Sequence, residues 1–518
     1  MDSYLIKQIT PEINPPTLKD NTADVDRIIR ALNKIFAPKE IKIDFSLIKD
    51  VPYKLRNANY KVSLCVSEIG NEVYIIDIFD ANNSDLYGLA VDLGSSTIVL
   101  RLINLITMKK IDEITFHNPQ IEIGTDILTR IHFASKQDGL MRLQNMLIDA
   151  INTEIYKLTK KYNISLDSIV GISIAGNTSM THLFLGLTPY WICREPYIPV
   201  VNKFFPLRAY KVGLKINPYA LLFVFPNVGS YFGGDLIAGI IASGMAKQSD
   251  EICILVDVGT NAEVVLGNSD WLIGCAGAAG PALEGGVVSM GMMAGPGVID
   301  KIKIDPETGN IEYHTIGEFP PIGICGSGLI DLVAQLFVAG MIDIRGKFVP
   351  ERCGNRLIEM DGIKYFIIVP KEKSGIDQAV TLSQPDIDSL IRSKAAMYTI
   401  LTTIVNTVNL SFNDIGKFYI AGTFGSYINP VSAITIGMIP DLPLEKYVPL
   451  GNTSIEGGSA LFSSPGCYNE MLKIRDMVTY IELNVNQEFM QLFSAAKFIP
   501  HTDRSLFPSV RQYHEKMY

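Results

Sequence analysis

The sequence predicts an α/β protein with two similar halves around a ligand cleft, preceded by a small α+β unit. The first observation is a repeat at the end of an apolar strand: residues 91–96 (VDLGSS) return 165 residues later as residues 256–261 (VDVGTN). The second is an Ala-Gly pair that closes a later apolar strand, at residues 175–176 and again at 421–422. Because both motifs recur in the same order, with amphipathic helices between them, we expect a duplicated fold.

Composition disfavours a nucleic-acid-binding protein and a membrane protein. Lys plus Arg is 45 against 54 for Asp plus Glu, a net charge of −9 that disfavours binding to nucleic-acid phosphates. Only 19% of residues are charged and 47% are hydrophobic, so we expect large buried cores and a subunit interface. The N-terminus does not look like a signal peptide, and the long uncharged stretch at residues 395–412 contains Thr, Ser and Asn. We therefore expect a soluble protein without a membrane span.

Seven scattered cysteines predict buried thiols in a reducing cytoplasm. No two of them form a C-x-x-C motif, so zinc knuckles and local iron–sulfur motifs are not expected. The six histidines show no ligand spacing, and no nucleophile elbow, H-E-x-x-H or Walker motif occurs.

The first 86 residues predict an arm and a small α+β linker domain. Three prolines within residues 1–20 favour an extended arm. Apolar side chains from Val25 to Phe36 then repeat with a helical period, and short β-like runs follow to residue 79, including residues 73–78.

The two halves are predicted at residues 87–250 and 251–500, with a C-terminal tail at 501–518. In the first half we expect a hairpin at 89–100, helices at 125–135, 139–162 and 236–245, and a strand at 168–175. In the second half we expect helices at 326–340 and 385–412, and an insertion at 268–375 that becomes β-like. The Gly- and Ala-rich stretch 271–283 predicts a close-packed loop or a helix start.

The repeated D-x-G motif has the chemistry of a phosphate site. An Asp ends a buried strand, and the small residues after it allow backbone N–H groups and hydroxyls to converge on phosphate oxygens. One such motif alone is more simply an ordinary hairpin, but two carboxylates facing one cleft repel each other unless a cation lies between them. We therefore predict Mg²⁺ at Asp92 and Asp257. The residues expected to surround the phosphates are Gly94, Ser95, Ser96, Thr97, Gly259, Thr260 and Asn261.

Three further features each have a functional and a structural interpretation. Gly422, Thr423 and Phe424 end a strand where a nucleoside could approach, or Thr423 simply caps a helix. Gly234 and Asp235 open a helix and either cap it or lie near nucleotide phosphates. Glu263 follows the second motif and either orients an attacking water or is an exposed strand residue.

These motifs resemble the two phosphate elements and the adenosine element of the superfamily of acetate and sugar kinases, heat-shock chaperones and actin. Further strings resemble one family within it, the reductive activators of corrinoid proteins. These strings are residues 118–120 (NPQ), 124–126 (GTD), 176–183 (GNTSMTHL), 279–285 (AGPALEG), 323–331 (GICGSGLID) and 451–453 (GNT).

The resemblance implies two actin-like ATPase halves around a nucleotide cleft, with ATP and Mg²⁺ as cofactors. It implies ATP-dependent reduction of cobalamin from Co(II) to Co(I) on the corrinoid protein of a methyltransferase system, by a cytoplasmic homodimer. In that assignment Asp92, Asp257 and Glu263 are the catalytic residues.

This sequence lacks the cysteines of the family's iron–sulfur domain. The electrons are therefore expected from a separated module or a ferredoxin-like protein, with no cluster in this chain. The alternative is a nucleotide-dependent chaperone-like or regulatory partner without redox activity, and a small-metabolite kinase ranks last.

Overall fold

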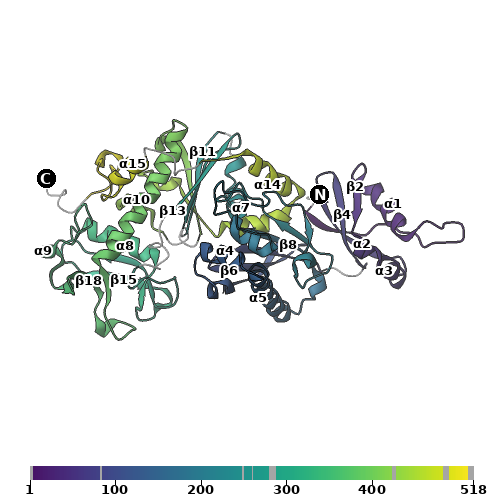
Figure 1. Ribbon diagram of the computed structural model, residues 1–518, viewed down its shortest axis with the longest axis horizontal. Helices are drawn as coiled ribbons and strands as arrows, with labels where there is room; N and C mark the ends of the chain where they lie inside the picture. The colour runs from purple at the N-terminus through teal and green to yellow at the C-terminus, as the bar shows by residue number, and fades with distance from the viewer. Residues whose placement is uncertain are drawn as a thin grey trace. The chain divides into compact units, whose positions relative to one another are not determined.

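The computed structural model describes residues 4–81, 85–247, 250–259, 261–278, 288–422, 428–481 and 489–511. The chain forms two compact units, shown in Figure 1. The first unit contains residues 1–244 and 453–478, and the second contains residues 245–452 and 479–518. The sequence predicts a cleft between the two halves. Each unit is described by itself, so this cleft stays a prediction.

The first unit begins with a small four-stranded sheet covered by helices, as the sequence predicts for an α+β linker. Its strand order is β1-β3-β4-β2, with β2 and β4 parallel and the other pairs antiparallel. The strands are β1 (Ile6–Ile9), β2 (Glu40–Ile43), β3 (Val62–Ile69) and β4 (Glu72–Asp80). The helices are α1 (Asp24–Phe36), α2 (Phe45–Ile48) and α3 (Val51–Asn57). The predicted helix from Val25 to Phe36 is thus confirmed.

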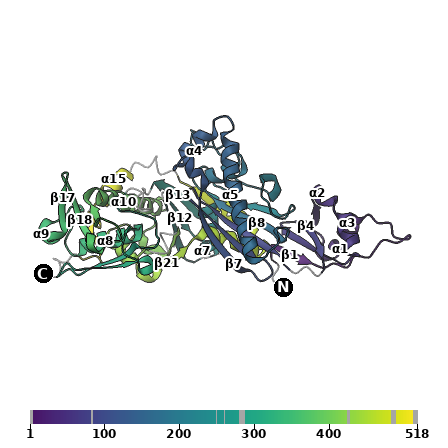
Figure 2. The same cartoon turned by 90° about the horizontal axis from the view of Figure 1, so that it is seen from below.

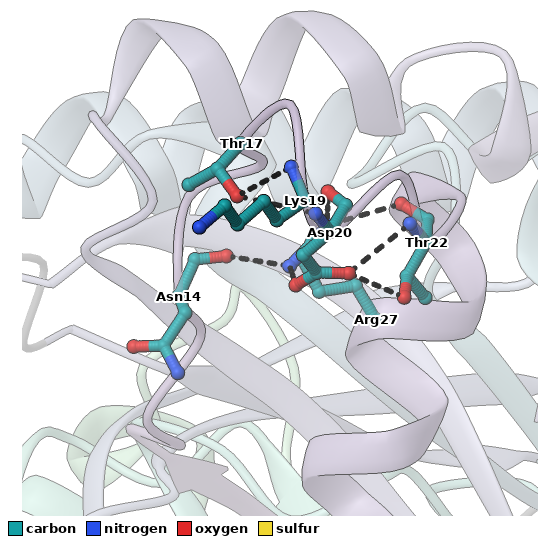
Figure 3. A network of polar contacts seen from close by, with 6 residues as sticks. All are labelled: Asn14, Thr17, Lys19, Asp20, Thr22 and Arg27. Atoms are coloured by element: carbon teal, nitrogen blue, oxygen red, sulfur yellow. Dashed lines mark hydrogen bonds and ion pairs between the residues drawn. The ribbon is translucent and has the colours of Figure 1, made fainter.

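The segment after β1 is tied to α1 by one buried arginine (Figure 3). Arg27, 5% exposed, donates to Asp20 Oδ2 at 2.6 Å and to the carbonyl oxygen of Asn14 at 3.0 Å. The Asp20 carboxylate also accepts from the Thr22 hydroxyl at 2.7 Å. These donors hold the pKa of Asp20 well below its ordinary value. Within the described residues the proline-rich arm therefore has a defined path: Ile6–Ile9 form β1, and Asp20 at its end is anchored to α1.

The rest of the first unit is built on a mixed sheet of order β7-β6-β5-β8-β10-β9. Strand β5 is antiparallel to β6 and parallel to β8, and β8 is parallel to β10. The strands are β5 (Tyr87–Leu93), β6 (Thr97–Asn104), β7 (Lys109–His117), β8 (Ile169–Gly176), β9 (Leu207–Arg208) and β10 (Leu221–Val224). The predicted hairpin and the strand after it are therefore confirmed.

Helices cover both faces of this sheet (Figures 1 and 2). The helices are α4 (Ile127–Ala134), α5 (Gly139–Tyr162), α6 (Thr178–Leu185), α7 (Gly234–Ser243), α13 (Thr453–Ala460) and α14 (Pro465–Met477). On one face α5 buries Leu143, Leu147 and Ile151, and each such side chain contributes roughly 1.5–3 kcal/mol. On the other face α13 packs against β5, β8 and α7. The chain thus returns from beyond residue 452 to complete the first unit, and the sequence gives no sign of this return.

The second unit repeats the sheet of the first. Its order is β21-β20-β11-β12-β13-β22, in which β13-β12-β11-β20-β21 matches β7-β6-β5-β8-β10. Strand β11 is antiparallel to β12 and parallel to β20, and β20 is parallel to β21. The strands are β11 (Ile252–Val258), β12 (Asn261–Gly267), β13 (Leu272–Ala278), β20 (Ile415–Ala421), β21 (Tyr447–Gly451) and β22 (Val478–Tyr480). The duplicated α/β fold is confirmed.

The remaining elements of the second unit include two small sheets. Their strands are β14 (Val298–Ile304), β15 (Ile311–Thr315) and β16 (Gly323–Ile324), then β17 (Leu357–Met360), β18 (Ile363–Val369) and β19 (Val380–Ser383). The helices are α8 (Gly326–Val338), α9 (Pro350–Cys353), α10 (Gln384–Thr407), α12 (Pro430–Thr435) and α15 (Phe489–Ala496). Among the helices in the described part of the chain, none is both long and apolar enough to span a bilayer.

Two local predictions are wrong. The sequence predicts a loop or a helix start over 271–283, but Leu272–Ala278 forms β13, because seven consecutive residues pair with β12; residues 279–283 lie outside the described residues. The helix expected to reach residue 412 ends at Thr407, since Asn409 takes a left-handed conformation with φ of 55°.

Candidate functional site

The first D-x-G motif forms a tight turn at the end of β5. Asp92 is the register partner of Val99 on β6 and of Ala175 on β8. Side chains alternate along a strand, so Asp92 faces away from the core that Val91 and Leu93 share with α5. A Cβ on Gly94 would lie 2.3 Å from the carbonyl oxygen of Thr97, so only glycine fits this turn.

The N-terminus of α7 meets the end of β8 beside this turn. Gly176 is the register partner of Leu93, and a Cβ on Gly233 would lie 2.4 Å from the Cα of Asn177. Three segments of small residues therefore converge where β5 and β8 end: the turn 94–97, residues 176–177, and the start of α7. A helix N-terminus in such a place presents free N–H groups to an anion.

Asp235 lies in the first turn of α7. Its Oδ1 accepts a hydrogen bond of 2.9 Å from the N–H of Leu236. Burial nevertheless raises the pKa of this carboxyl to about 6, because the charged form loses its hydration. A raised pKa is a property of a general base, whereas the N–H groups of a helix N-terminus favour the ionised carboxylate, so burial is the larger of the two effects on Asp235.

The second motif has the same register with one important change. Asp257 on β11 pairs with Ala421 on β20, just as Asp92 pairs with Ala175. Across the hairpin, however, Asp257 faces Glu263 on β12, where the first unit has Val99. Opposed side chains of an antiparallel pair lie on one face with Cβ atoms about 5 Å apart. Two carboxylates at that spacing suit a hard cation such as Mg²⁺.

Gly422 closes the second site against Asp257. It has a φ of +82°, and a Cβ there would lie 2.9 Å from Oδ1 of Asp257. Gly259 follows β11 and Asn261 begins β12. Thr260, Thr423 and Phe424 lie outside the described residues, so their predicted roles stay predictions.

Two residues that the sequence did not assign to the site contact the first turn. Asn118, after β7, donates from Nδ2 to the carbonyl oxygen of Gly94 at 2.9 Å. Arg130, on α4, donates from Nη1 to the carbonyl oxygen of Ser95 at 2.7 Å. Asn118 belongs to the string 118–120 that resembles the corrinoid activators, and this was the available signal for the first, whereas a lone arginine on a helix carries none.

The described residues do not form a metal site made of protein ligands alone. Within the described ranges, no three His, Cys, Asp or Glu side chains group in a way that could hold a metal ion. Magnesium bound through phosphates needs only one or two carboxylates, because waters complete its octahedron. Glycines at both turns leave the room that phosphates would require.

Most of the cysteines are shielded from solvent. All seven are unpaired and six are buried. Burial raises the pKa of Cys253 and Cys353 to about 11 and that of Cys275 to about 12, so these thiols stay protonated at neutral pH.

The duplicated sheet, with an Asp at the same register position in each copy, defines an α/β protein of the actin-like ATPase class. Three family models match successive parts of the chain: the RACo linker region at residues 3–85, the RACo middle region at 87–248, and the C-terminal domain of RACo, described as the ASKHA domain, at 251–511. The chain belongs to the RACo family, the reductive activators of corrinoid proteins.

Individual relatives agree with this assignment. A solved structure described as "Reductive activator for corrinoid,iron-sulfur protein" is 37% identical, with a TM-score of 0.89, over 98% of this chain and 81% of that one. The "Corrinoid activation enzyme RamQ" of Eubacterium limosum is 29% identical over 81% of this chain and 72% of its own length. A "[Co(II) methylated amine-specific corrinoid protein] reductase" of Methanosarcina barkeri is 24% identical over 76% of this chain and 73% of its own.

Proposed function

We propose that this protein is an ATP-dependent reductive activator that returns the cobalt of a corrinoid protein from Co(II) to Co(I). The observation that carries the proposal is the pair of D-x-G turns at equivalent register positions, Asp92 beside Ala175 and Asp257 beside Ala421, in a chain of the RACo family. The corrinoid protein would belong to a methyltransferase system, in which Co(I) is the methyl acceptor.

ATP would supply the free energy for an uphill electron transfer. One electron converts Co(II) to Co(I), while ATP and water become ADP and phosphate. For a one-electron step, 59 mV corresponds to about 1.4 kcal/mol, so a cycle of several kcal/mol offsets a gap on the order of 200 mV. The coupling would be conformational, with nucleotide state changing the affinity for the corrinoid protein.

Within the nucleotide site, Asp92 and Asp257 would hold Mg²⁺, and the two turns would surround the phosphates. Gly422, Thr423 and Phe424 would contact the nucleoside. Glu263 is the candidate for orienting water, because it faces Asp257 directly. Asp235 is a second candidate, since its carboxyl titrates near pH 6.

The electron would come from an iron–sulfur module outside residues 1–518, either on further chain or on a ferredoxin-like protein. The cysteines of this chain are unpaired, and those with raised pKa values do not favour a thiolate cluster. Free thiols also favour a reducing compartment, the cytoplasm. Exposed apolar side chains such as Trp191, 54% exposed, and Phe205, 74% exposed, are compatible with a homodimer.

The test is to mix the protein, ATP, a one-electron reductant and candidate Co(II) corrinoid proteins while following the cobalt absorption spectrum and phosphate release. We expect Co(I) to form only with ATP, and ATP turnover to rise when the corrinoid protein is added. An Asp257→Ala protein should support neither. If ATP binds, and turnover and the cobalt spectrum are both unaffected by the corrinoid protein, the chain is a nucleotide-dependent regulatory partner instead.

A further inference from the structure

Three successive carbonyl groups of the first turn are held by buried residues from outside the hairpin. Asn118 donates from Nδ2 to the oxygen of Gly94 at 2.9 Å and from its backbone N–H to the oxygen of Ser96 at 2.9 Å. Arg130 donates from Nη1 to the oxygen of Ser95, between them, at 2.7 Å. Two residues from outside the hairpin thus fix three successive peptide groups.

This arrangement decides where the amide groups of the turn point. In a planar trans peptide the C=O and the N–H of the next residue point in opposite directions. Carbonyls turned toward Asn118 and Arg130 therefore turn the N–H groups of Ser95, Ser96 and Thr97 to the opposite side. Successive N–H groups with a common direction form a concave anion site.

Arg130 is unusual among the buried arginines of the first unit. Arg27, Arg101 and Arg208 each have a carboxylate within 3.5 Å. Arg130 is fully buried, yet among the described residues its guanidinium donates to the carbonyls of Ser95 and Gly124 and to the Sδ of Met180, and to no carboxylate. Its Nη2 has no hydrogen-bond partner in the described structure.

The charge of Arg130 is correspondingly unbalanced. The acidic side chain that acts on it is Asp126, whose carboxylate is exposed and accepts from the N–H and hydroxyl of Thr129. Desolvation lowers the pKa of Arg130, which shows that burial outweighs this attraction. A buried cation without an ion pair lowers the stability of the fold, and an anion that approaches it when a ligand binds would offset this cost.

Both residues are themselves rigidly held. Oδ1 of Asn118 accepts from the N–H of Gln120 at 2.9 Å, and Nε2 of Gln120 donates to the carbonyl of Leu143 on α5 at 2.9 Å. Arg130 Nε donates at 2.8 Å to the carbonyl of Gly124. The turn is therefore preorganised by a network that reaches the core of the first unit.

We propose that Asn118 and Arg130 are positioning residues that hold the turn 94–97 in its phosphate-binding conformation, and that the nucleotide's phosphates balance the charge of Arg130 through this turn. The inference rests on the proposed ATP binding. The positioning residues touch the turn and not the nucleotide, so their loss should weaken binding of the polyphosphate more than binding of the nucleoside end.

The experiment compares Arg130→Met with Arg208→Met in the full chain. Arg208 is a matched control, because it is also buried and also donates to backbone carbonyls, those of Tyr219 and Ile75, but it lies on β9, where it contacts the linker sheet and not the turn 94–97. Isothermal titration with Mg-ATP and with AMP, together with thermal melting, gives affinity and stability separately. We expect Arg130→Met to weaken Mg-ATP binding about tenfold to a hundredfold and AMP binding less than about twofold.

Arg208→Met should lower the melting temperature without changing the ratio of the two affinities. Arg130→Lys keeps the charge and one donor, so it should restore part of the Mg-ATP affinity. It replaces Arg130→Met in the comparison if the Met variant does not fold. The inference is overturned if the Arg130 variants bind Mg-ATP as wild type does, or lose Mg-ATP and AMP equally. Absence of Mg-ATP binding by the wild-type protein would instead overturn the proposed function.

Discussion

Asp257 and Glu263 are directly opposed across the β11–β12 hairpin, whereas the equivalent partner of Asp92 is Val99. Asp92 and Asp257 therefore occupy equivalent register positions beside β8 and β20, but the charge of the residue opposite each of them across its hairpin differs. Only the second turn places two carboxylates on one face, so it has the stronger requirement for a cation.

Asp257→Asn should weaken the binding of the Mg²⁺ that supports nucleotide binding. We expect the variant to need at least about tenfold more Mg²⁺ for the same ATP affinity, because loss of even an outer partner of a metal lowers metal affinity by that much. A magnesium titration of ATP affinity measures it. Glu263→Gln is the comparison: if Glu263 orients water, kcat falls while nucleotide affinity stays within about twofold. Equal magnesium responses in wild type and Asp257→Asn would contradict the assignment.

Gly422→Ala should abolish ATP binding, while it should destabilise the fold only to the extent that any alanine with positive φ does. An alanine with positive φ costs roughly 1–2 kcal/mol wherever it occurs. At Gly422 the added Cβ would also lie 2.9 Å from Asp257 Oδ1. Gly362→Ala is the matched control, since Gly362 has a φ of +75° and nothing within 4 Å of an added Cβ. Similar melting temperatures with unequal ATP affinities are expected, and equal affinities would refute the role of Gly422.

Asp235→Asn should stabilise the protein at neutral pH. The folded protein raises the pKa of Asp235 to about 6, so folding favours the protonated form. The ionised carboxyl therefore costs stability, and this cost appears as the pH rises from about 4 to about 6. Its upper limit is about 3 kcal/mol. Thermal melting should show a gain for Asp235→Asn at pH 7.5 and none at pH 4.

Asp305 provides the control of opposite sign. Backbone N–H groups of Thr308 and Glu307 lower the pKa of this exposed carboxyl. Its ionised form is therefore favoured by folding, and Asp305→Asn should slightly lower the melting temperature at pH 7.5. A gain for both variants would show that the effect reflects net charge and not burial of Asp235.

The thiols should differ sharply in reactivity. Cys193 is partly exposed, and the other six are buried. Under native conditions a thiol reagent such as Ellman's reagent should therefore modify one cysteine quickly, and Cys193→Ser should remove that phase. Six slow thiols that react only on unfolding are expected. Several fast thiols in the Cys193→Ser protein would contradict the burial.

Local patterns were sufficient for much of the fold. The helices α1 and α5 and the β5–β6 hairpin follow from residue periodicity, because each depends on contacts between near neighbours in sequence. The stretch 272–278 could not be assigned this way, since its Gly and Ala residues have no strand pattern and become a strand only by pairing with β12. Arg130 lies 35 residues from the turn it supports, and a lone arginine carries no sequence signal.

The amino-acid sequence is sufficient to predict two related α/β halves, each with an Asp at the end of its first strand, and a resemblance to the corrinoid activators. A repeated motif and a hydrophobic period are local properties, so they are visible in the sequence. The folded chain was needed to find that Glu263 faces Asp257, that α13 completes the first unit, and that Asn118 and Arg130 donate to the carbonyls of Gly94 and Ser95. Those relationships depend on strand register and on buried charges brought together from distant segments, which no local pattern specifies.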